Sequence, residues 1–147
     1  MKKLIVALAA VALIGGCVKT GKNGEQEVNV LGAKVETGTS LPADAPPYVK
    51  AYPGAGEIVK MKIAGMSAVA FEAPASVDEV IAYYRTQAAA DGLPELPEQK
   101  PPSGAANQKG VTFGDPGGER MLMVLARPGK QGTMVSLTYK PAATAPQ

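Results

Sequence analysis

The sequence predicts an α+β fold in which one helix packs on one face of an antiparallel sheet of about five strands, in the order ββαβββ. Three observations support this prediction. Several short segments alternate apolar and polar residues with a period of two, which is typical of half-buried strands. One segment places apolar residues at helical spacing behind a capping motif. The 13 prolines and 17 glycines lie mostly between these segments and mark the turns.

Residues 57–64 and 67–72 form the first predicted hairpin, joined by a tight connection at Gly65. The side chains that we expect to point toward the core are Val59, Met61, Ile63, Val69 and Phe71. Lys60 and Lys62 fall on the opposite face of the first strand. A solvated sheet face is the ordinary interpretation of these two lysines, and anion binding is the alternative.

The segment before this hairpin, 41–55, is predicted to be an ordered loop. Its prolines favour extended backbone in the residues that precede them. Tyr52-Pro53-Gly54-Ala55 predicts a turn, because proline presets a negative φ and glycine accepts a positive one.

The helix is predicted over 77–90. Ser76-Val-Asp-Glu79 is a capping box, in which the Ser76 hydroxyl and the Glu79 carboxylate satisfy backbone N–H groups at the helix start. The apolar stripe that faces the sheet consists of Val77, Val80, Ile81, Tyr84 and Ala88. Gly92 is suited to the left-handed position that ends the helix.

Three further strands are predicted over 109–113, 119–127 and 133–139. The segment 119–127 is a continuous apolar run with charged ends, which predicts a central strand buried on both sides. The last strand alternates, and the residues on its inward face are Val135, Leu137 and Tyr139. The proline-rich stretch 93–107 is either a mobile loop or an extended edge that returns to the sheet.

The ends of the chain are polar or proline-rich. We expect a flexible tether over 17–40, the α+β domain over 41–140 and a disordered tail over 141–147. Alternating valines in 27–36 leave two interpretations of the tether open: an edge ribbon that adds to the sheet, or a disordered stalk.

The first residues form a leader. Lys2 and Lys3 precede an uncharged apolar run over 4–14, which is long enough for a secretory signal peptide and too short for a membrane-spanning helix. The run ends in Ile14-Gly15-Gly16-Cys17, which resembles the lipobox of bacterial lipoproteins. The resemblance implies that a signal peptide over 1–16 is removed, that Cys17 receives a diacylglycerol group and that the new N-terminus is acylated.

The same resemblance implies a location. Val18 stands where many inner-membrane lipoproteins have aspartate, so we expect a lipid-anchored protein of the cell envelope, at the outer membrane facing the periplasm. Cys17 is the single cysteine, so no disulfide or thiolate metal site is expected.

A second resemblance covers roughly residues 41–140. The Tyr52-Pro53-Gly54-Ala55 turn and the helix start Ser76-Val-Asp-Glu-Val-Ile-Ala-Tyr-Tyr-Arg85 are similar to small bacterial lipoprotein and secreted domains with a "YPGA" turn, mostly of unknown function. These motifs are structural. Gly92-Leu93 replaces the Gly-Trp pair of many relatives, which implies that Leu93 fills the same place in the core with less volume.

Composition argues against catalysis. The chain has no histidine, and without Lys2 and Lys3 its basic and acidic residues are equal in number, so neither a histidine base nor a nucleic-acid footprint is expected. The acidic candidates are Glu57, Glu72, Asp78, Glu79, Asp115 and Glu119, and the serines are Ser67, Ser103 and Ser136. They do not assemble a nucleophile, base and orienting group, so we expect no enzyme, no cofactor and no metal.

The sequence therefore predicts a monomeric, membrane-anchored, non-catalytic module that acts in structure or protein interaction in the envelope. Its partner would use the open sheet face, expected to be polar and weakly basic. That expected face carries Met134, Ser136, Thr138, Lys60 and Lys62. The alternative is a carrier of a small apolar ligand or lipid, with a pocket between helix and sheet. The methionines that would line the pocket are Met61, Met121, Met123 and Met134.

Overall fold

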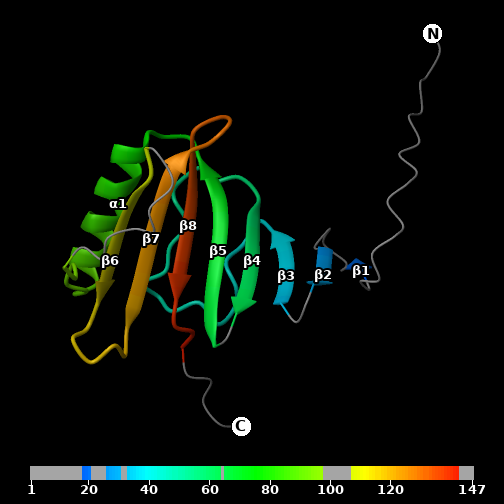
Figure 1. The fold of residues 1–147 in the computed structure, drawn as a ribbon, viewed down its shortest axis with the longest axis horizontal. Helices are drawn as coiled ribbons and strands as arrows, with labels where there is room; N and C mark the ends of the chain where they lie inside the picture. The colour runs from blue at the N-terminus through cyan, green and yellow to red at the C-terminus, as the bar shows by residue number, and fades with distance from the viewer. Residues whose placement is uncertain (1–17, 21–25, 31–32, 64, 98–106, 143–147) are drawn as a thin grey trace.

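The structure is a computed structural model that describes residues 18–20, 26–30, 33–63, 65–97 and 107–142 (Figure 1). The predicted signal peptide, the lipidation site at Cys17 and most of the predicted tail lie outside these residues. The described chain forms one antiparallel sheet and one α-helix, so the predicted α+β class is confirmed.

The sheet has eight strands in the order β1-β2-β3-β4-β5-β8-β7-β6, and every neighbouring pair is antiparallel. The strands are β1 (Val18–Thr20), β2 (Gln26–Val30), β3 (Ala33–Gly38), β4 (Ile58–Ile63), β5 (Met66–Ala73), β6 (Lys109–Gly114), β7 (Met121–Pro128) and β8 (Thr133–Tyr139). Helix α1 (Val77–Ala90) joins β5 to the second half of the sheet. The five predicted strands correspond to β4–β8 and keep their predicted order around the helix.

The sheet extends further toward the N-terminus than the prediction of about five strands. β3 pairs with β4 in the register Val35 to Met61 and Thr37 to Val59, and β2 pairs with β3. The edge-ribbon interpretation of this stretch is therefore confirmed for 26–30 and 33–38. Six strands, β3–β8, form the body of the sheet, which begins before residue 41, where we expected the folded domain to start.

Helix α1 begins and ends as the sequence predicts. The Ser76 N–H donates to Glu79 Oε2 at 2.8 Å and the Glu79 N–H donates to Ser76 Oγ at 3.3 Å, which completes the capping box. Gly92 has a φ of 66°, in the left-handed region, directly after the helix. The buried residues of α1 are Val80, Ile81, Tyr84 and Ala88.

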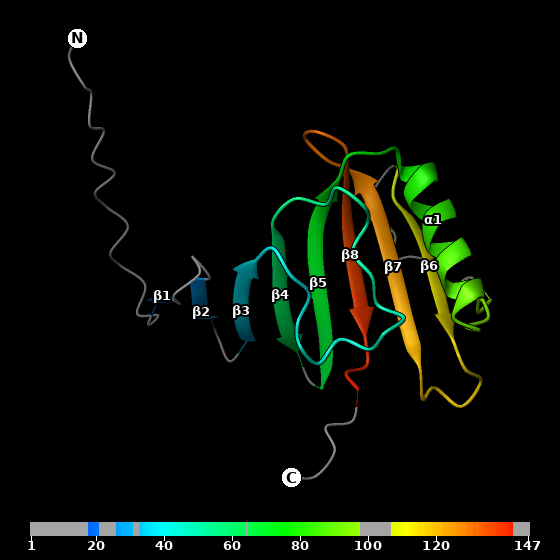
Figure 2. The same ribbon diagram turned by 180° about the vertical axis from the view of Figure 1, so that it is seen from behind.

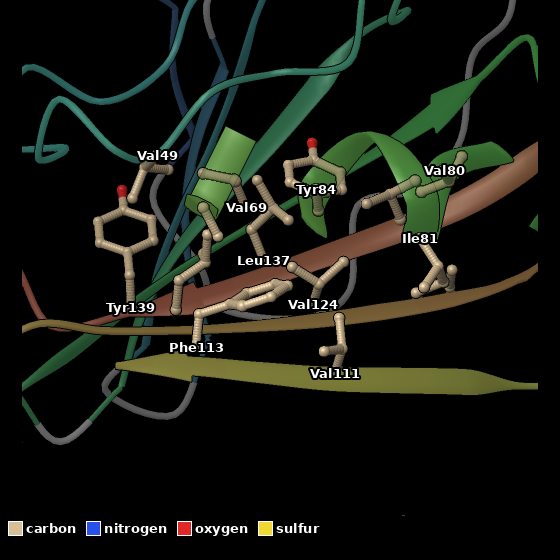
Figure 3. Packing of buried hydrophobic residues seen from close by; sticks show 14 of the residues in the cluster. Val49, Val69, Val80, Ile81, Tyr84, Val111, Phe113, Val124, Leu137 and Tyr139 are labelled. Carbon is tan, nitrogen blue, oxygen red and sulfur yellow. The ribbon is translucent and has the colours of Figure 1, made fainter. Parts of the chain in front are cut away.

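The hydrophobic core is a single layer on one face of the sheet. Helix α1 covers β6, β7 and β8, and residues 39–57, here called the covering segment, cross the same face beside it (Figure 2). The Tyr84 hydroxyl donates to the carbonyl of Lys50 at 2.9 Å and so ties the helix to the covering segment. The strand residues of this core include Val69, Phe71, Val111, Phe113, Val124, Val135, Leu137 and Tyr139 (Figure 3). The inward faces predicted for β5 and β8 are therefore confirmed.

The predicted inward face of β4 is wrong. Ile58 and Lys60 lie on the core side, 2% and 9% exposed, while Val59 and Met61 are half-buried on the other side. The side chain of Ile63 lies outside the described part. The register pairs Lys60 with Val69, so the core face of β5 determines which face of β4 turns inward. A lysine tolerates this position because its four-carbon stem packs as an apolar chain.

The prediction that β7 is buried on both sides is also wrong. Leu122, Val124 and Ala126 are buried, whereas Met121, Met123 and Leu125 alternate with them and are half-buried. The described helix and covering segment lie on only one face of the sheet, so the second apolar face of β7 has no layer above it.

Part of the stretch 93–107 belongs to the sheet edge. Leu93 is buried, Glu95 forms a bridge with Phe113, and the Leu96 N–H donates to the Thr112 carbonyl at 2.8 Å. The extended-edge interpretation therefore holds for 94–96. Residues 98–106 lie outside the described residues.

Candidate interaction surface

The sheet face opposite α1 and the covering segment is here called the open face (Figure 1). Strand alternation and register place these half-buried residues on it: Val59, Met61, Met66, Ala68, Ala70, Met121, Met123, Leu125, Met134, Ser136 and Thr138. Nothing in the described ranges packs against their side chains as a second layer. Large contiguous apolar patches on protein surfaces are typical of interaction sites.

The predicted character of this face is wrong in one respect. Met134, Ser136 and Thr138 do lie on it, but Lys60 and Lys62 lie on the opposite face, in register with Val69 and Ser67. Aliphatic and methionine side chains replace the expected lysines. The open face is therefore apolar, with a hydroxyl-bearing centre on β8, and not weakly basic.

Register aligns the open-face residues in rows that cross β4, β5, β8, β7 and β6, in that order, and two of these rows continue onto β3 at Val35 and Thr37. The first row is Met61, Ala68, Thr138, Met123 and Thr112, and the second is Val59, Ala70, Ser136, Leu125 and Gly110. A third, shorter row is Glu72, Met134 and Arg127. In the first two rows, large and small side chains alternate on either side of a small polar residue on β8.

Two charged residues lie at one end of the open face. Glu72 is half-buried and accepts the backbone N–H of Gln131 in the β7–β8 turn, whereas Arg127 is exposed. Both are register partners of Met134, one on each side of β8. The charges at this end are thus opposite in sign and symmetric about the strand.

The acidic candidates from the sequence are dispersed, and several have structural partners. Asp78 pairs with Lys109, Glu79 caps α1, and Glu72 holds the β7–β8 turn. Asp115 makes two hydrogen bonds of 2.8 Å to Arg120, and this pairing lowers the pKa of the Asp115 carboxyl. Glu57 and Glu119 are exposed in loops, at the start of β4 and in the β6–β7 turn.

The serine candidates are also separate from one another. Ser67 is buried on the core side of β5, Ser136 lies on the open face, and Ser103 lies outside the described residues. Within the described ranges no group of three His, Cys, Asp or Glu side chains could hold a metal ion. No described helix is long and apolar enough to cross a membrane.

A hollow of about 550 Å³ lies between β3, β4 and the covering segment. Three lysines line it, namely Lys34, Lys60 and Lys62. Lys62 pairs with Asp44 at 2.6 Å, and Lys34 pairs with Glu36 at 2.7 Å. The hydrogen bond from Lys34 lowers the pKa of Glu36, so both partners stay charged and the positive charge of the hollow is largely neutralised.

The predicted carrier pocket would lie between helix and sheet. Buried side chains of α1 and of the strands fill that space instead (Figure 3). The methionines proposed to line the pocket, Met61, Met121, Met123 and Met134, lie on the open face, where strand alternation places them. Their adaptable side chains thus contribute to an exposed surface.

Sequence reasoning missed the extent of this surface, although β7 carried a signal for it. Met123 and Leu125 are apolar and alternate with Val124, so they point to the opposite face of the strand. A strand that is apolar on both faces needs packing partners on both sides. Comparison with protein-family models, with curated proteins and with solved structures gave no match.

Proposed function

We propose that this chain is a membrane-anchored bacterial lipoprotein that acts as a non-catalytic interaction module in the cell envelope, facing the periplasm at the outer membrane. Lipidation at Cys17 would hold it there. The observation that carries the interaction role is the open face, an apolar surface over β4, β5, β8 and β7 without a described covering layer.

The non-catalytic part of the proposal rests on how the polar side chains are used. The carboxylates of Asp78, Glu79 and Asp115 engage in a salt bridge, a helix cap and a turn. A catalytic site needs a nucleophile and a base within hydrogen-bond reach of each other and open to substrate. The open face offers hydroxyls at Ser136 and Thr138, and the carboxylate in the neighbouring row, Glu72, accepts the backbone N–H of Gln131 and holds the β7–β8 turn.

The anchoring part is tested with the full chain in a bacterial host. Metabolic labelling with a clickable fatty acid should label the wild type, and its mass should show removal of residues 1–16. Cys17→Ser should abolish the label and leave the uncut precursor, because the hydroxyl of serine does not replace the thiol in lipid transfer. A labelled Cys17→Ser chain, or cleavage at another position, would contradict the anchor.

The interaction part is tested with a photo-crosslinking amino acid placed on either side of the molecule. At Met123 on the open face it should give defined protein adducts in intact cells. At Ala82, on the exposed side of α1, it should give none above background. Equal adducts from both positions, or none from Met123, would count against the open face as the interaction surface.

A further inference from the structure

We propose that the open face binds the open face of a second copy of this chain, around a two-fold axis that runs along β8. The inference rests on the proposed function, because it names the partner of the same surface. It replaces the monomer that the sequence predicts.

The row pattern is self-complementary under this rotation. A two-fold axis along β8 keeps each row at its own height and places β5 of one copy over β7 of the other, and β4 over β6. In the second row Ala70 then faces Leu125 of the other copy, and Val59 faces its Gly110. In this row each large side chain therefore meets a small one.

The first row follows the same rule. Ala68 faces Met123 of the other copy, and Met61 faces its Thr112. Three β8 residues lie on the axis and face their own copies: the small Ser136, the β-branched Thr138 and, in the third row, Met134, whose flexible side chain adapts to its symmetry mate. Large side chains opposite small ones let two sheets interdigitate at their usual separation of about 10 Å.

The third row adds charge complementarity. Because Glu72 and Arg127 lie on opposite sides of Met134, the rotation places each Arg127 over Glu72 of the other copy. A partner of different sequence would match this pattern only if it carried an acidic group opposite Arg127 and a basic group opposite Glu72. A second copy matches it by symmetry, as an isologous interface requires.

The size of the face is sufficient. Five strands about 4.8 Å apart and about seven residues long, at about 3.3 Å per residue, span about 550 Å² per copy. Two such faces would therefore bury about 1,100 Å² in total when the faces are treated as flat. Specific protein interfaces bury more than about 1,000 Å².

The test uses the full chain with two different C-terminal tags, co-expressed and solubilised from membranes with a mild detergent. Capture through one tag should recover the other, and native mass spectrometry should show twice the mass of one chain. Ala70→Leu places two leucines against each other at both symmetry-related sites, so co-capture should fall about tenfold. The double variant Ala70→Leu/Leu125→Ala exchanges large and small, so co-capture should recover.

Two further variants complete the design. Ala82→Leu adds the same volume on the exposed side of α1 and should leave co-capture unchanged. Arg127→Glu places carboxylates together on both sides of the axis, so its loss of co-capture should be greater at low salt than at high salt. Thermal unfolding of each variant shows that it is folded.

Several outcomes overturn the inference. If Ala70→Leu is co-captured as efficiently as the wild type, the open face is excluded as the dimer contact. Loss of co-capture in Ala70→Leu without recovery in the double variant excludes the two-fold axis along β8. A monomeric mass together with open-face adducts to another protein would overturn the dimer but would agree with the proposed function. The absence of any adduct from the open face would contradict both the dimer and the proposed interaction role.

Discussion

Two buried tyrosines on the core side use their hydroxyls differently. The Tyr84 hydroxyl donates to the Lys50 carbonyl, and its pKa is raised far above the ordinary range, chiefly by burial. The hydroxyls of Tyr139 and of its register partner Ser67 are buried near each other, and neither makes a hydrogen bond of ordinary geometry. Burial, and then the charge of Asp44, raise the pKa of Tyr139 to about 12. Both phenols therefore remain neutral at physiological pH.

This difference makes a paired prediction at the residue scale. Tyr84→Phe should lower the free energy of unfolding by about 1 kcal/mol, because it leaves the Lys50 carbonyl without its donor. Tyr139→Phe should be close to neutral, because it removes a buried hydroxyl that makes no hydrogen bond of ordinary geometry. Urea denaturation of both variants measures this. A Tyr139→Phe chain as destabilised as Tyr84→Phe would show that the Tyr139 hydroxyl is satisfied in solution.

At the scale of the element, α1 is specified by its own sequence. Its capping box satisfies backbone donors at the first turn, and Gly92 ends it in a left-handed conformation. At the other end, Lys50 bonds Gln87 and Asp91, and Arg120 donates to the Asp91 and Gly92 carbonyls. These contacts attach the end of the helix to the covering segment and to the β6–β7 turn, which no local pattern predicted.

The capping box makes stability dependent on pH. Hydrogen bonds from the Ser76 side chain and backbone lower the pKa of Glu79 below its ordinary value of 4.5. A carboxyl whose pKa is lower in the folded than in the unfolded state stabilises the fold fully at pH values above its unfolded pKa. This stabilisation is lost as the pH falls through the folded pKa. The urea midpoint should therefore fall between pH 6 and pH 3, with contributions of the same sign from Glu95 beside Arg85 and Asp115 beside Arg120.

Glu79→Gln is the variant that isolates this effect. Glutamine can still bond the Ser76 N–H but does not titrate, so the fall in the urea midpoint should be shallower than in the wild type. Ser76→Ala removes the partner and should also reduce the pH dependence, while lowering stability at pH 7 by about 1 kcal/mol. An unchanged pH profile in Glu79→Gln would show that the capping box does not contribute.

The strands β2 and β3 place the start of the sheet before residue 41. β3 pairs with β4 over five register positions, from Lys34 with Lys62 to Gly38 with Ile58. A strand that follows so soon after the predicted anchor leaves little of the expected tether free. In the lipidated protein, the edge of the sheet would therefore lie close to the membrane.

A truncation tests this boundary. A chain that starts at residue 41 loses β3 and makes β4 an exposed edge, so it should unfold at lower urea and scatter more light than a chain that starts at residue 33. Sedimentation and urea denaturation of the two chains compare them directly. Equal stability and equal size would show that β3 adds nothing to the folded body.

Much of this protein is determined by its sequence. The capping box and helical stripe of α1 and the alternation in β5 and β8 are local patterns, so the α+β class and the buried faces of those elements follow from them. Cys17 and its flanking residues predict the anchor in the same local way.

The buried faces of β4 and β7, and the open face, depend instead on which strands pair with one another. In β4 and β7, both faces of the strand carry residues that can be buried. Only the pairing with β5 and β8 turns Lys60 and not Met61, and Val124 and not Met123, toward the core. That selection leaves a second apolar face without a described layer. The open face arises from long-range register, which no short stretch of sequence encodes.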